Sequence, residues 1–384
     1  MSGAILVLLL SVATLLSVAY LAVVLGCVSR LVGHRRAAIG WRPPVTVLKP
    51  LCGLEPLLEE NLRSFCTQDY PEYEVVFGVG TPDDPAARVV DRLAAEGHRC
   101  RLEFVVDGRM SGPNAKVSNL ANMHEHTKHD VIVVSDSDMR VDADWLAGVV
   151  APLADPAVGL VTCLYRAHSL GGLPSALGAM HVNEWFAPAV SVAATFGGGP
   201  FGFGSTLALR RETLEALGGF KTLSAYLADD YVLAARVVEL GQRIVLSDTV
   251  VEMIVSEPGI RALFAHEVRW ARVVRSVRPL GWTLSCLTNT LPLALACSIA
   301  SGFSPASTVM LGLAVTLRLA VHALAPSYLG LRVGRAPWLV PLRDAMSLVV
   351  WATSFFGSGV DWRGRRMSVG PGGLAGGAKS APSC

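Results

Sequence analysis

The feature that most constrains the fold is a short, wholly apolar run that ends in two carboxylates. Val131 to Val134 consists of four branched residues, and Ser135-Asp136-Ser137-Asp138 follows directly. Such a run is typical of a strand covered on both faces, and ligands in open α/β sheets gather beyond the carboxyl ends of such strands. The run therefore predicts a buried strand that presents Asp136 and Asp138 at a binding crevice.

Two carboxylates in that position suit a divalent metal ion. Oxygen ligands of this kind hold Mg²⁺ or Mn²⁺, and such ions commonly bind the phosphates of a substrate at the same time. An acidic turn after the strand is the alternative interpretation, because Asp and Ser are also common turn formers. The rest of the sequence must decide between the two.

The first forty residues indicate attachment to a membrane. Ala4 to Val28 is an almost uninterrupted apolar run, long enough to cross the ~30 Å hydrocarbon layer of a bilayer. Hydrophobic residues make up 52% of the chain and charged residues only 17%, which is unusual for a soluble domain. Arg30, Arg35 and Arg36 follow the run, whereas no Lys or Arg precedes it. This asymmetry predicts an outer N-terminus and a cytoplasmic chain after Arg30.

A cleaved signal peptide is the alternative interpretation of this run. In a signal peptide, however, the basic residues precede a shorter apolar stretch. We therefore expect residues 1–40 to form a transmembrane helix with a basic flank.

Short apolar runs alternate with helical patterns from residue 41 to about residue 278. The pattern predicts strands at 45–48, 73–79, 102–106 and 131–134 and helices at 55–66, 86–96 and 117–126. Strands that alternate with helices form right-handed crossovers and a mainly parallel sheet. We therefore expect residues 41–278 to form a cytosolic α/β domain of the nucleotide-binding type.

Apolar character returns after Pro279. Three segments carry it, at 280–300, 307–325 and 338–356. Arg318 in the second segment and Arg343 and Asp344 in the third would be costly in lipid, so we expect them to face protein, to pair, or to lie near the interface. We interpret the first two segments as membrane helices and residues 279–360 as the C-terminal membrane region.

The third segment has basic residues on both sides. They are Arg332, Arg335, Arg363, Arg365 and Arg366. This distribution favours a re-entrant or interfacial segment over a true span, because a re-entrant segment would keep both groups in the cytoplasm. Residues 361–384 are expected to form a basic stretch and then, after Val369, a disordered Gly-rich tail.

Three further polar motifs accompany the predicted strands and helices. They are Asp83-Asp84-Pro85, Asn114-Ala115-Lys116 and Asp229-Asp230-Tyr231. Each alone is a common turn or helix start. After strands of one parallel sheet, however, loops converge on a single crevice, which favours a shared site. The chain has no basic run interleaved with aromatic residues, so no nucleic-acid partner is expected.

The segment from His266 to Trp270 adds a cation and two aromatic rings. In a helix His266, Arg269 and Trp270 would share one face, because they lie three and four residues apart. A guanidinium there suits a diphosphate, and an indole suits a position near lipid headgroups. A basic amphipathic helix on the membrane surface is the alternative, and both interpretations can hold together.

With these motifs the chain resembles the GT-A fold glycosyltransferases of families 2 and 21. It is most similar to the ceramide glucosyltransferase-like family and, within it, to the branch associated with bacterial hopanoid biosynthesis. The resemblance spans about residues 4–370. Its motifs are Val47-Leu48-Lys49-Pro50-Leu51, Gln68-Asp69-Tyr70-Pro71, Asp83-Asp84-Pro85, Asn114-Ala115-Lys116-Val117-Ser118-Asn119-Leu120, Ser135-Asp136-Ser137-Asp138, Leu227-Ala228-Asp229-Asp230-Tyr231 and Arg269-Trp270.

The resemblance implies an α/β GT-A domain flanked by transmembrane helices, and an enzyme that moves glucose or N-acetylglucosamine from a UDP-sugar to the hydroxyl of a membrane lipid with inversion. Asp230 is the implied general base, with Asp229 as the alternative. A divalent ion (Mg or Mn) would bind first at Asp136 and then at Asp138. The remaining implied site residues are Asp84, Asn114 and Lys116 for the nucleotide, and His266, Arg269 and Trp270 at the catalytic centre.

One departure from the family pattern concerns the acceptor. His266 stands where ceramide enzymes usually carry Gln or Arg. The hopanoid-associated branch resembles the chain better at this position. That resemblance implies a hopanoid such as bacteriohopanetetrol as the acceptor, in a bacterial inner membrane with the catalytic domain in the cytoplasm, and ceramide is the alternative.

Two other interpretations compete with lipid glycosylation. A processive polysaccharide synthase would share the acidic sites, but such enzymes generally carry Gln-x-x-Arg-Trp and a longer membrane channel. A transporter or membrane scaffold would show paired repeats of spans and would have no place for the α/β domain.

Overall fold

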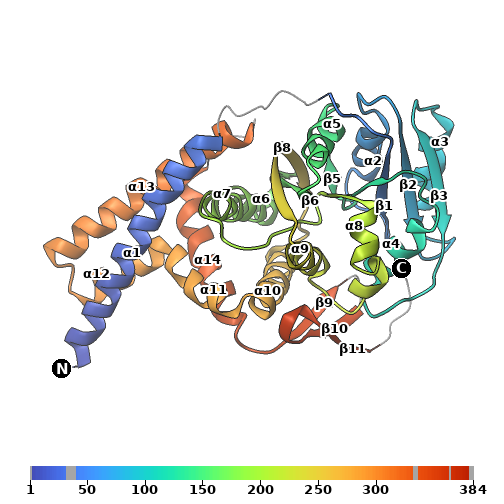
Figure 1. Ribbon diagram of the computed structural model, residues 1–384. Helices are drawn as coiled ribbons and strands as arrows, with labels where there is room; N and C mark the ends of the chain where they lie inside the picture. Colours follow the sequence, from blue (N-terminus) through green and yellow to red (C-terminus); the bar gives the residue numbers. More distant parts are fainter. Residues whose placement is uncertain (1, 32–39, 332–335, 363–364, 380–384) are drawn as a thin grey trace. The chain divides into compact units, whose positions relative to one another are not determined.

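The computed structural model describes residues 2–31, 40–331, 336–362 and 365–379 (Figure 1). The predicted basic flanks at Arg35, Arg36, Arg332, Arg335 and Arg363 lie outside the described residues, as does the side chain of Arg30. The contacts divide the chain into two units. The helical unit comprises Met1–His34, Ser169–Gly198 and Glu257–Gly357, and the sheet unit comprises Arg35–His168, Gly199–Ser256 and Ser358–Cys384. The expected boundary at residue 278 does not coincide with this division.

The sheet unit contains an eight-stranded sheet in the order β3-β2-β1-β4-β7-β6-β8-β5. Its strands are β1 Val45–Pro50, β2 Tyr73–Val79, β3 Arg101–Val106, β4 Val131–Val134, β5 Met139–Arg140, β6 Val158–Ser169, β7 Leu207–Arg210 and β8 Arg243–Val255. Strands β3, β2, β1 and β4 run parallel, whereas β7 is antiparallel to β4 and to β6, and β5 is antiparallel to β8. The predicted α/β class is confirmed, and the parallel strands are the four predicted ones.

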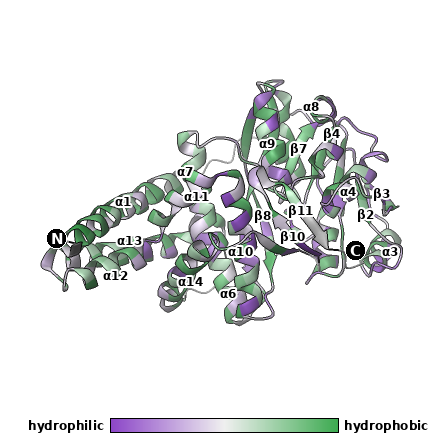
Figure 2. Ribbon diagram, turned by 90° about the horizontal axis from the view of Figure 1, so that it is seen from below, coloured by the Kyte–Doolittle hydropathy of each residue, from purple (hydrophilic) through white to green (hydrophobic). Residues whose placement is uncertain are grey.

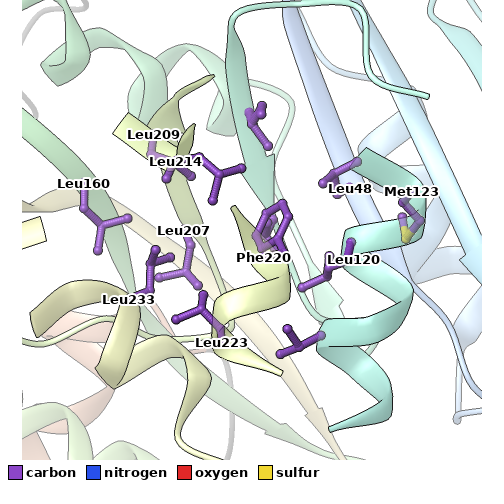
Figure 3. Close-up of a cluster of buried hydrophobic side chains, with 14 of the residues drawn as sticks. Leu48, Leu120, Met123, Leu160, Leu207, Leu209, Leu214, Phe220, Leu223 and Leu233 are labelled. Carbon is purple, nitrogen blue, oxygen red and sulfur yellow. The ribbon is translucent and has the colours of Figure 1, made fainter. Parts of the chain in front are cut away.

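Helices cover this sheet, and several of them share an apolar core with it (Figure 3). The helices are α2 Leu58–Cys66, α3 Ala87–Ala95, α4 Ala115–His124, α5 Trp145–Val150, η1 Ala151–Ala154, α8 Arg211–Ala216, η3 Phe220–Leu223 and α9 Asp229–Glu239. Leu48 of β1 and Leu207 of β7 are buried with Leu120 of α4 and Leu233 of α9. Truncating such a leucine to alanine typically costs 2–5 kcal/mol. This core fixes the first turns of α4 and α9, which carry the candidate site residues.

The helical unit contains the long apolar helices and the helices that pack with them. They are α1 Ser2–Leu31, α6 Gly172–His181, η2 Val182–Phe186, α7 Ala187–Phe196, α10 Ile260–Val277, α11 Pro279–Leu284, η4 Ser285–Thr288, α12 Thr290–Ala300, α13 Pro305–Leu329, η5 Pro337–Leu339 and α14 Val340–Thr353. Helix α1 packs along α12 and α13, and all three are largely hydrophobic (Figures 1 and 2).

Two helices are long and apolar enough to cross a membrane, at Gly3–Val28 and Pro305–Leu329. The segment predicted as one membrane helix at 280–300 is instead bent by 64° between Thr288 and Thr290. Among the described residues the chain thus has two candidate spans, or three if this bent pair is one span.

The charged residues of the C-terminal segments are paired inside the protein, as expected. Arg318 of α13 contacts Asp344 of α14 at 3.0 Å and Glu184 of η2 at 2.9 Å. Arg343 of α14 contacts Glu267 of α10 at 2.6 Å. Burial in low dielectric requires such pairing, because an unpaired charge there would be strongly destabilising.

A second, three-stranded sheet closes the described chain. It consists of β9 Gly359–Trp362, β10 Arg365–Val369 and β11 Ala375–Lys379, with η6 Pro371–Gly373 between the last two strands. The expectation of a disordered tail after Val369 is therefore wrong for residues 371–379. Its composition has few apolar side chains, but backbone hydrogen bonds to Ala225 and Leu227 stabilise it.

Candidate active site

Lys116 and Asp136 form the centre of a polar cluster at the carboxyl end of β4. The Nζ atom of Lys116, in the first turn of α4, lies 2.6 Å from Oδ1 of Asp136 and 3.7 Å from Oδ2 of Asp229. Strand β4 delivers Asp136 to this point, since Ser135 and the four preceding residues are buried. Three of the residues singled out in the sequence are therefore brought together here.

Asp229 and Asp230 begin α9 and are held in place by neighbouring loops. Asn114 caps α4 by accepting from the amide of Val117, and its side chain donates to Oδ1 of Asp229 at 3.2 Å. The amide of Tyr231 donates to Oδ1 of Asp230 at 2.8 Å. Carboxylates at a helix N-terminus are favoured by the helix dipole.

Gly204 joins the two acidic positions through its backbone. Its amide donates to Oδ2 of Asp230 at 3.1 Å, and its carbonyl accepts from the amide of Asp136 at 3.0 Å. A Cβ atom at this position would lie 2.4 Å from Oδ2 of Asp136 and 2.9 Å from Nζ of Lys116. Only glycine therefore fits at this position without displacing both charged groups.

The electrostatics of the cluster favour a proton on Asp230 near neutral pH. Burial, reinforced by the charge of Asp229, raises the pKa of Asp230 to about 7. Burial also raises the pKa of Asp229. Burial opposes the charge of Lys116, but Asp136, Asp229 and Asp230 outweigh it and raise the pKa of its ammonium group. The site thus combines a permanent cation with a carboxyl that exchanges its proton near pH 7.

Asp136 and Asp138, which follow β4, are the predicted metal ligands. Among the residues that the structure describes, no group of three or more His, Cys, Asp or Glu side chains could hold a metal. Mg²⁺ usually binds one or two carboxylates together with substrate phosphates rather than a cage of protein ligands. The side chain of Asp136 is one-third exposed, so it can still be reached by a ligand.

Asp84 makes its hydrogen bonds in the loops after β1 and β2. Its carboxylate accepts from the amide of Gly53 at 3.0 and 3.1 Å and from the amide of Ala86 at 2.8 Å. Because β2, β1 and β4 are parallel neighbours, this loop lies at the same edge of the sheet as Asp136. Asp84 therefore shapes the loops at that edge.

His266, Arg269 and Trp270 belong to the helical unit, on α10. The rings of His266 and Trp270 lie 4.2 Å apart, and the guanidinium of Arg269 lies 6.0 Å from the indole centroid. The predicted shared face is thus confirmed. Glu257 pairs with Nδ1 of His266 at 2.8 Å, and His181 stacks on Trp270 at 6.4 Å.

Sequence reasoning did not assign a role to three residues around Asp136. Gly204 is one of them, because it has no side chain that could indicate a role. The second is Lys49 of β1, which is fully buried and donates to the carbonyl of Asp136 and, at 3.4 Å, to Ser135. The third is Tyr165 of β6, whose pKa is raised by burial and then by Asp230, Asp138 and Asp136. In the sequence, a lysine in the otherwise apolar run 45–48 and its continuation was the sign that Lys49 needs polar partners.

The fold defines the class of the protein. The chain superposes on a mannosyltransferase from Pyrobaculum calidifontis, solved in complex with GDP-mannose and Mn²⁺, with a TM-score of 0.50. The match covers 90% of this chain and 99% of that one at 23% sequence identity. The chain therefore has the GT-A fold of nucleotide-sugar glycosyltransferases.

The family model of glycosyl transferase family 21 matches residues 9–375, and the chain belongs to this family. Ceramide glucosyltransferase 3 of Caenorhabditis elegans is 23% identical over 238 residues, which are 62% of this chain and 52% of that protein. A ceramide glucosyltransferase of Pyricularia oryzae is 34% identical over 115 residues, which are 26% of this chain and 23% of that one. The chain spans about half the length of its first-ranking curated relatives.

Proposed function

We propose that this protein is an inverting glycosyltransferase that moves glucose or N-acetylglucosamine from a UDP-sugar to a hydroxyl group of a membrane lipid. The observation that carries the proposal is the carboxyl of Asp230, whose pKa is about 7, in one cluster with Lys116 and Asp136. This combination suits a reaction that needs a base and a cation at one place.

Asp230 is the proposed general base. A hydroxyl attacks the anomeric carbon in line with the bond to the diphosphate, and Asp230 takes the hydroxyl proton as the new bond forms. A base works best when its pKa lies near the operating pH, and burial gives Asp230 such a pKa. The single displacement inverts the configuration at the anomeric carbon.

The leaving diphosphate carries negative charge that the site must neutralise. Lys116 would face it from the first turn of α4, and Arg269 would bind it by two parallel hydrogen bonds. Asp136, together with Asp138, would hold a divalent ion, which supplies further neutralisation of the diphosphate. Asp84 and Asn114 would support nucleotide binding by fixing the loops at this edge of the sheet.

The metal role has its own test. Asp136→Ala should abolish the Mn²⁺-dependent part of UDP binding, measured by calorimetry with and without the ion. A variant that binds UDP with the same metal dependence as the wild type would remove Asp136 from this role. Asp136→Ala also removes the carboxylate that contacts Lys116. UDP binding measured without metal is the internal control, because it reports the effect of losing that contact alone.

A lipid acceptor accounts for the apolar helices. A polycyclic or two-chained lipid leaves the bilayer slowly, so the catalytic residues must work at the membrane surface. Helix α14 suits that surface: Leu342 and Val349 are about half exposed, whereas Arg343 and Asp344 on its other side are buried. The 14 residues of α14 extend over about 21 Å, less than the ~30 Å of the hydrocarbon layer, and the exposed apolar side chains suit contact with lipid.

Chain connectivity supports the same membrane arrangement. Residues 373–375 bond to residues 225–227 within the sheet unit, so both lie on one side of the bilayer. An even number of crossings must therefore separate residue 278 from residue 358. The bent pair α11–α12 and helix α13 would supply two, and α14 would not cross. We place this protein in a bacterial inner membrane, with three spans and a cytoplasmic sheet unit.

The acceptor is proposed to be a hopanoid such as bacteriohopanetetrol. The motif His266-x-x-Arg269-Trp270 of this protein supports the choice, because it resembles the hopanoid-associated branch more than the ceramide enzymes. Ceramide is the second candidate, because the similar curated proteins are ceramide glucosyltransferases. Membranes containing the protein should be incubated with UDP-glucose or UDP-N-acetylglucosamine and either lipid, and the products identified by mass spectrometry. We expect a glycosylated hopanoid; glycosylceramide alone would select the second candidate, and no glycolipid from any pair would contradict the proposed function.

A further inference from the structure

The loop that leads into Asp229 and Asp230 is held by the C-terminal part of the chain. The amide of Leu227 donates to the carbonyl of Gly373 at 2.8 Å, and the amide of Ala375 donates to the carbonyl of Ala225 at 2.8 Å. Tyr226 and Leu374 form an antiparallel bridge between these two bonds. Residues 373–375 thus act as a short extra strand for the loop. All of these residues belong to the sheet unit.

The same loop is held from its other side by Asn114. The amide of Asn114 donates to the carbonyl of Ser224 at 3.0 Å, and its side chain donates to the carbonyl of Tyr226 at 2.7 Å. The side chain also reaches Oδ1 of Asp229 at 3.2 Å. The loop is therefore held by Asn114 on the one hand and by residues 373–375 on the other.

The C-terminal strap, defined here as residues 358–362 and 365–379, is itself well bonded. Strand β10 pairs with both β9 and β11, and Val369 donates to the carbonyl of Ser358 at 2.8 Å. Gly370 donates to the carbonyl of Leu374 at 2.7 Å, which closes a tight loop around η6. Gly372 and Gly373 have φ values of 69° and 81°, a region in which other residues are strained. The strap thus presents Gly373 and Ala375 in a fixed geometry.

We propose that the C-terminal strap is a positioning element for Asp229 and Asp230. Its backbone fixes residues 225–227, and these residues set where α9 begins and where both carboxylates point. Small displacements of a catalytic group cost large factors in rate, which gives a contact outside the site an effect on catalysis. The inference rests on the proposed function of Asp230 as the base, and it adds residues 373–375 to the parts that catalysis needs.

Ala375→Pro tests the strap with one lost hydrogen bond, because proline has no amide to donate to Ala225. Ala375→Ser keeps the amide and is the matched control. We expect Ala375→Pro to lower kcat about tenfold or more while the Kd for UDP stays within about twofold of wild type, because Asp84, Lys116 and Asp136 are supplied by other loops. Ala375→Ser should keep the wild-type values of both.

Amide hydrogen exchange of residues 224–230 provides a readout that does not depend on activity. Ala375→Pro should speed exchange in this segment and leave that of strand β4 unchanged. Slow exchange as in the wild type, or fast exchange with unchanged kcat, would overturn the inference. A wild-type protein that glycosylates no lipid would instead contradict the proposed function, and the inference with it.

A truncation makes the same test if Ala375→Pro does not accumulate in membranes. Removing residues 371–384 deletes η6 and β11, whereas removing residues 380–384 leaves every described residue in place. The longer truncation should lose kcat and loop protection together, and the shorter one should keep both. Equal kcat in the two truncated proteins would also overturn the inference.

Discussion

At the scale of single residues, Asp230 has opposite effects on catalysis and on stability. Its pKa of about 7 in the folded protein exceeds the ordinary value of about 4 for an aspartate. Between these two pH values the folded protein holds a proton that the unfolded chain has released. The free energy of unfolding therefore falls as pH rises through this window, because the native state binds more protons. Burial therefore gives Asp230 a pKa suited to a base and lowers the free energy of unfolding above about pH 4.

The proton on Asp230 predicts a pH profile. A base must be deprotonated to act, so kcat/KM should fall below pH 7, tenfold for each unit, and level off above it. Initial rates of glycolipid formation between pH 5.5 and 8.5 provide the measurement. A profile that is flat across this range would contradict the assignment of Asp230 as the base.

The stability effect predicts the behaviour of Asp230→Asn. Asparagine carries no charge, so this variant should unfold a few degrees above the wild type at pH 8 and show no such gain at about pH 3.5, where Asp230 is protonated in both the folded and the unfolded chain. Thermal unfolding in detergent at the two pH values tests it. An equal shift at both values would show that charge is not the cause.

Gly204 predicts a second residue-level effect. In Gly204→Ala the new methyl group would press on Asp136 and Lys116, so activity should fall about tenfold or more while the protein still folds. Gly312→Ala, in α13, makes the same chemical change where nothing lies within 4 Å. It should keep full activity in the same assay. Wild-type activity of Gly204→Ala would show that the cluster tolerates a shift of its two charges.

The sequence predicted the charged residues of the Lys116–Asp136 cluster better than the backbone contacts around them. Asp136, Asp230 and Lys116 could be found because their side chains carry chemistry and follow strands or begin helices. Gly204 could not, since its role lies in an amide and a carbonyl that every residue type possesses. Lys49 could have been singled out by its place in an apolar strand, because a fully buried lysine needs polar partners to be stable.

At the scale of elements, α10 is held to α14 by a buried ion pair. Arg343 donates to both oxygens of Glu267 at 2.6 and 2.8 Å, and both side chains are 2% exposed. Glu267 lies between His266 and Arg269 in the chain. The pair therefore fixes the helix that carries the predicted diphosphate-binding arginine.

Breaking this pair should destabilise the helical unit. Glu267→Gln or Arg343→Gln alone leaves one buried charge without its partner, which typically costs about 3–5 kcal/mol. The double variant should lose less than the sum of the two, and a double-mutant cycle from thermal unfolding measures the difference. Additive losses would mean that the two side chains do not stabilise each other.

Element boundaries were predictable where hydrophobic periodicity was strong. Strands β2 and β4 begin and end at the predicted residues, and α2, α3 and α4 differ by at most a few. The strands after β4 were not predicted, because they pair antiparallel and fall outside the regular alternation of strand and helix. The tail sheet was missed because its strands carry few apolar side chains. The bend in the segment 280–300 was also missed, since composition alone does not reveal where a helix breaks.

At the scale of the whole molecule, the strap constrains the path of the chain through the membrane. Single-cysteine variants at Asp130, Ala306 and Ser358, in a background without the native cysteines, test the path with an impermeant thiol reagent on sealed vesicles. All three positions are exposed in the structure. Asp130 and Ser358 should react from one side and Ala306 from the other. Labelling of Asp130 and Ser358 from opposite faces would contradict the three-span arrangement.

The central claim is that Asp230 transfers the acceptor proton as a sugar moves from a UDP-sugar to a lipid. The most direct measurement compares wild-type and Asp230→Asn membranes, given UDP-N-acetylglucosamine and bacteriohopanetetrol, for glycolipid formed and UDP bound. The account predicts a β-linked glycolipid from the wild type, a rate at least about 100-fold lower for the variant, and equal UDP binding by both. Equal rates of glycolipid formation by the two proteins would contradict it.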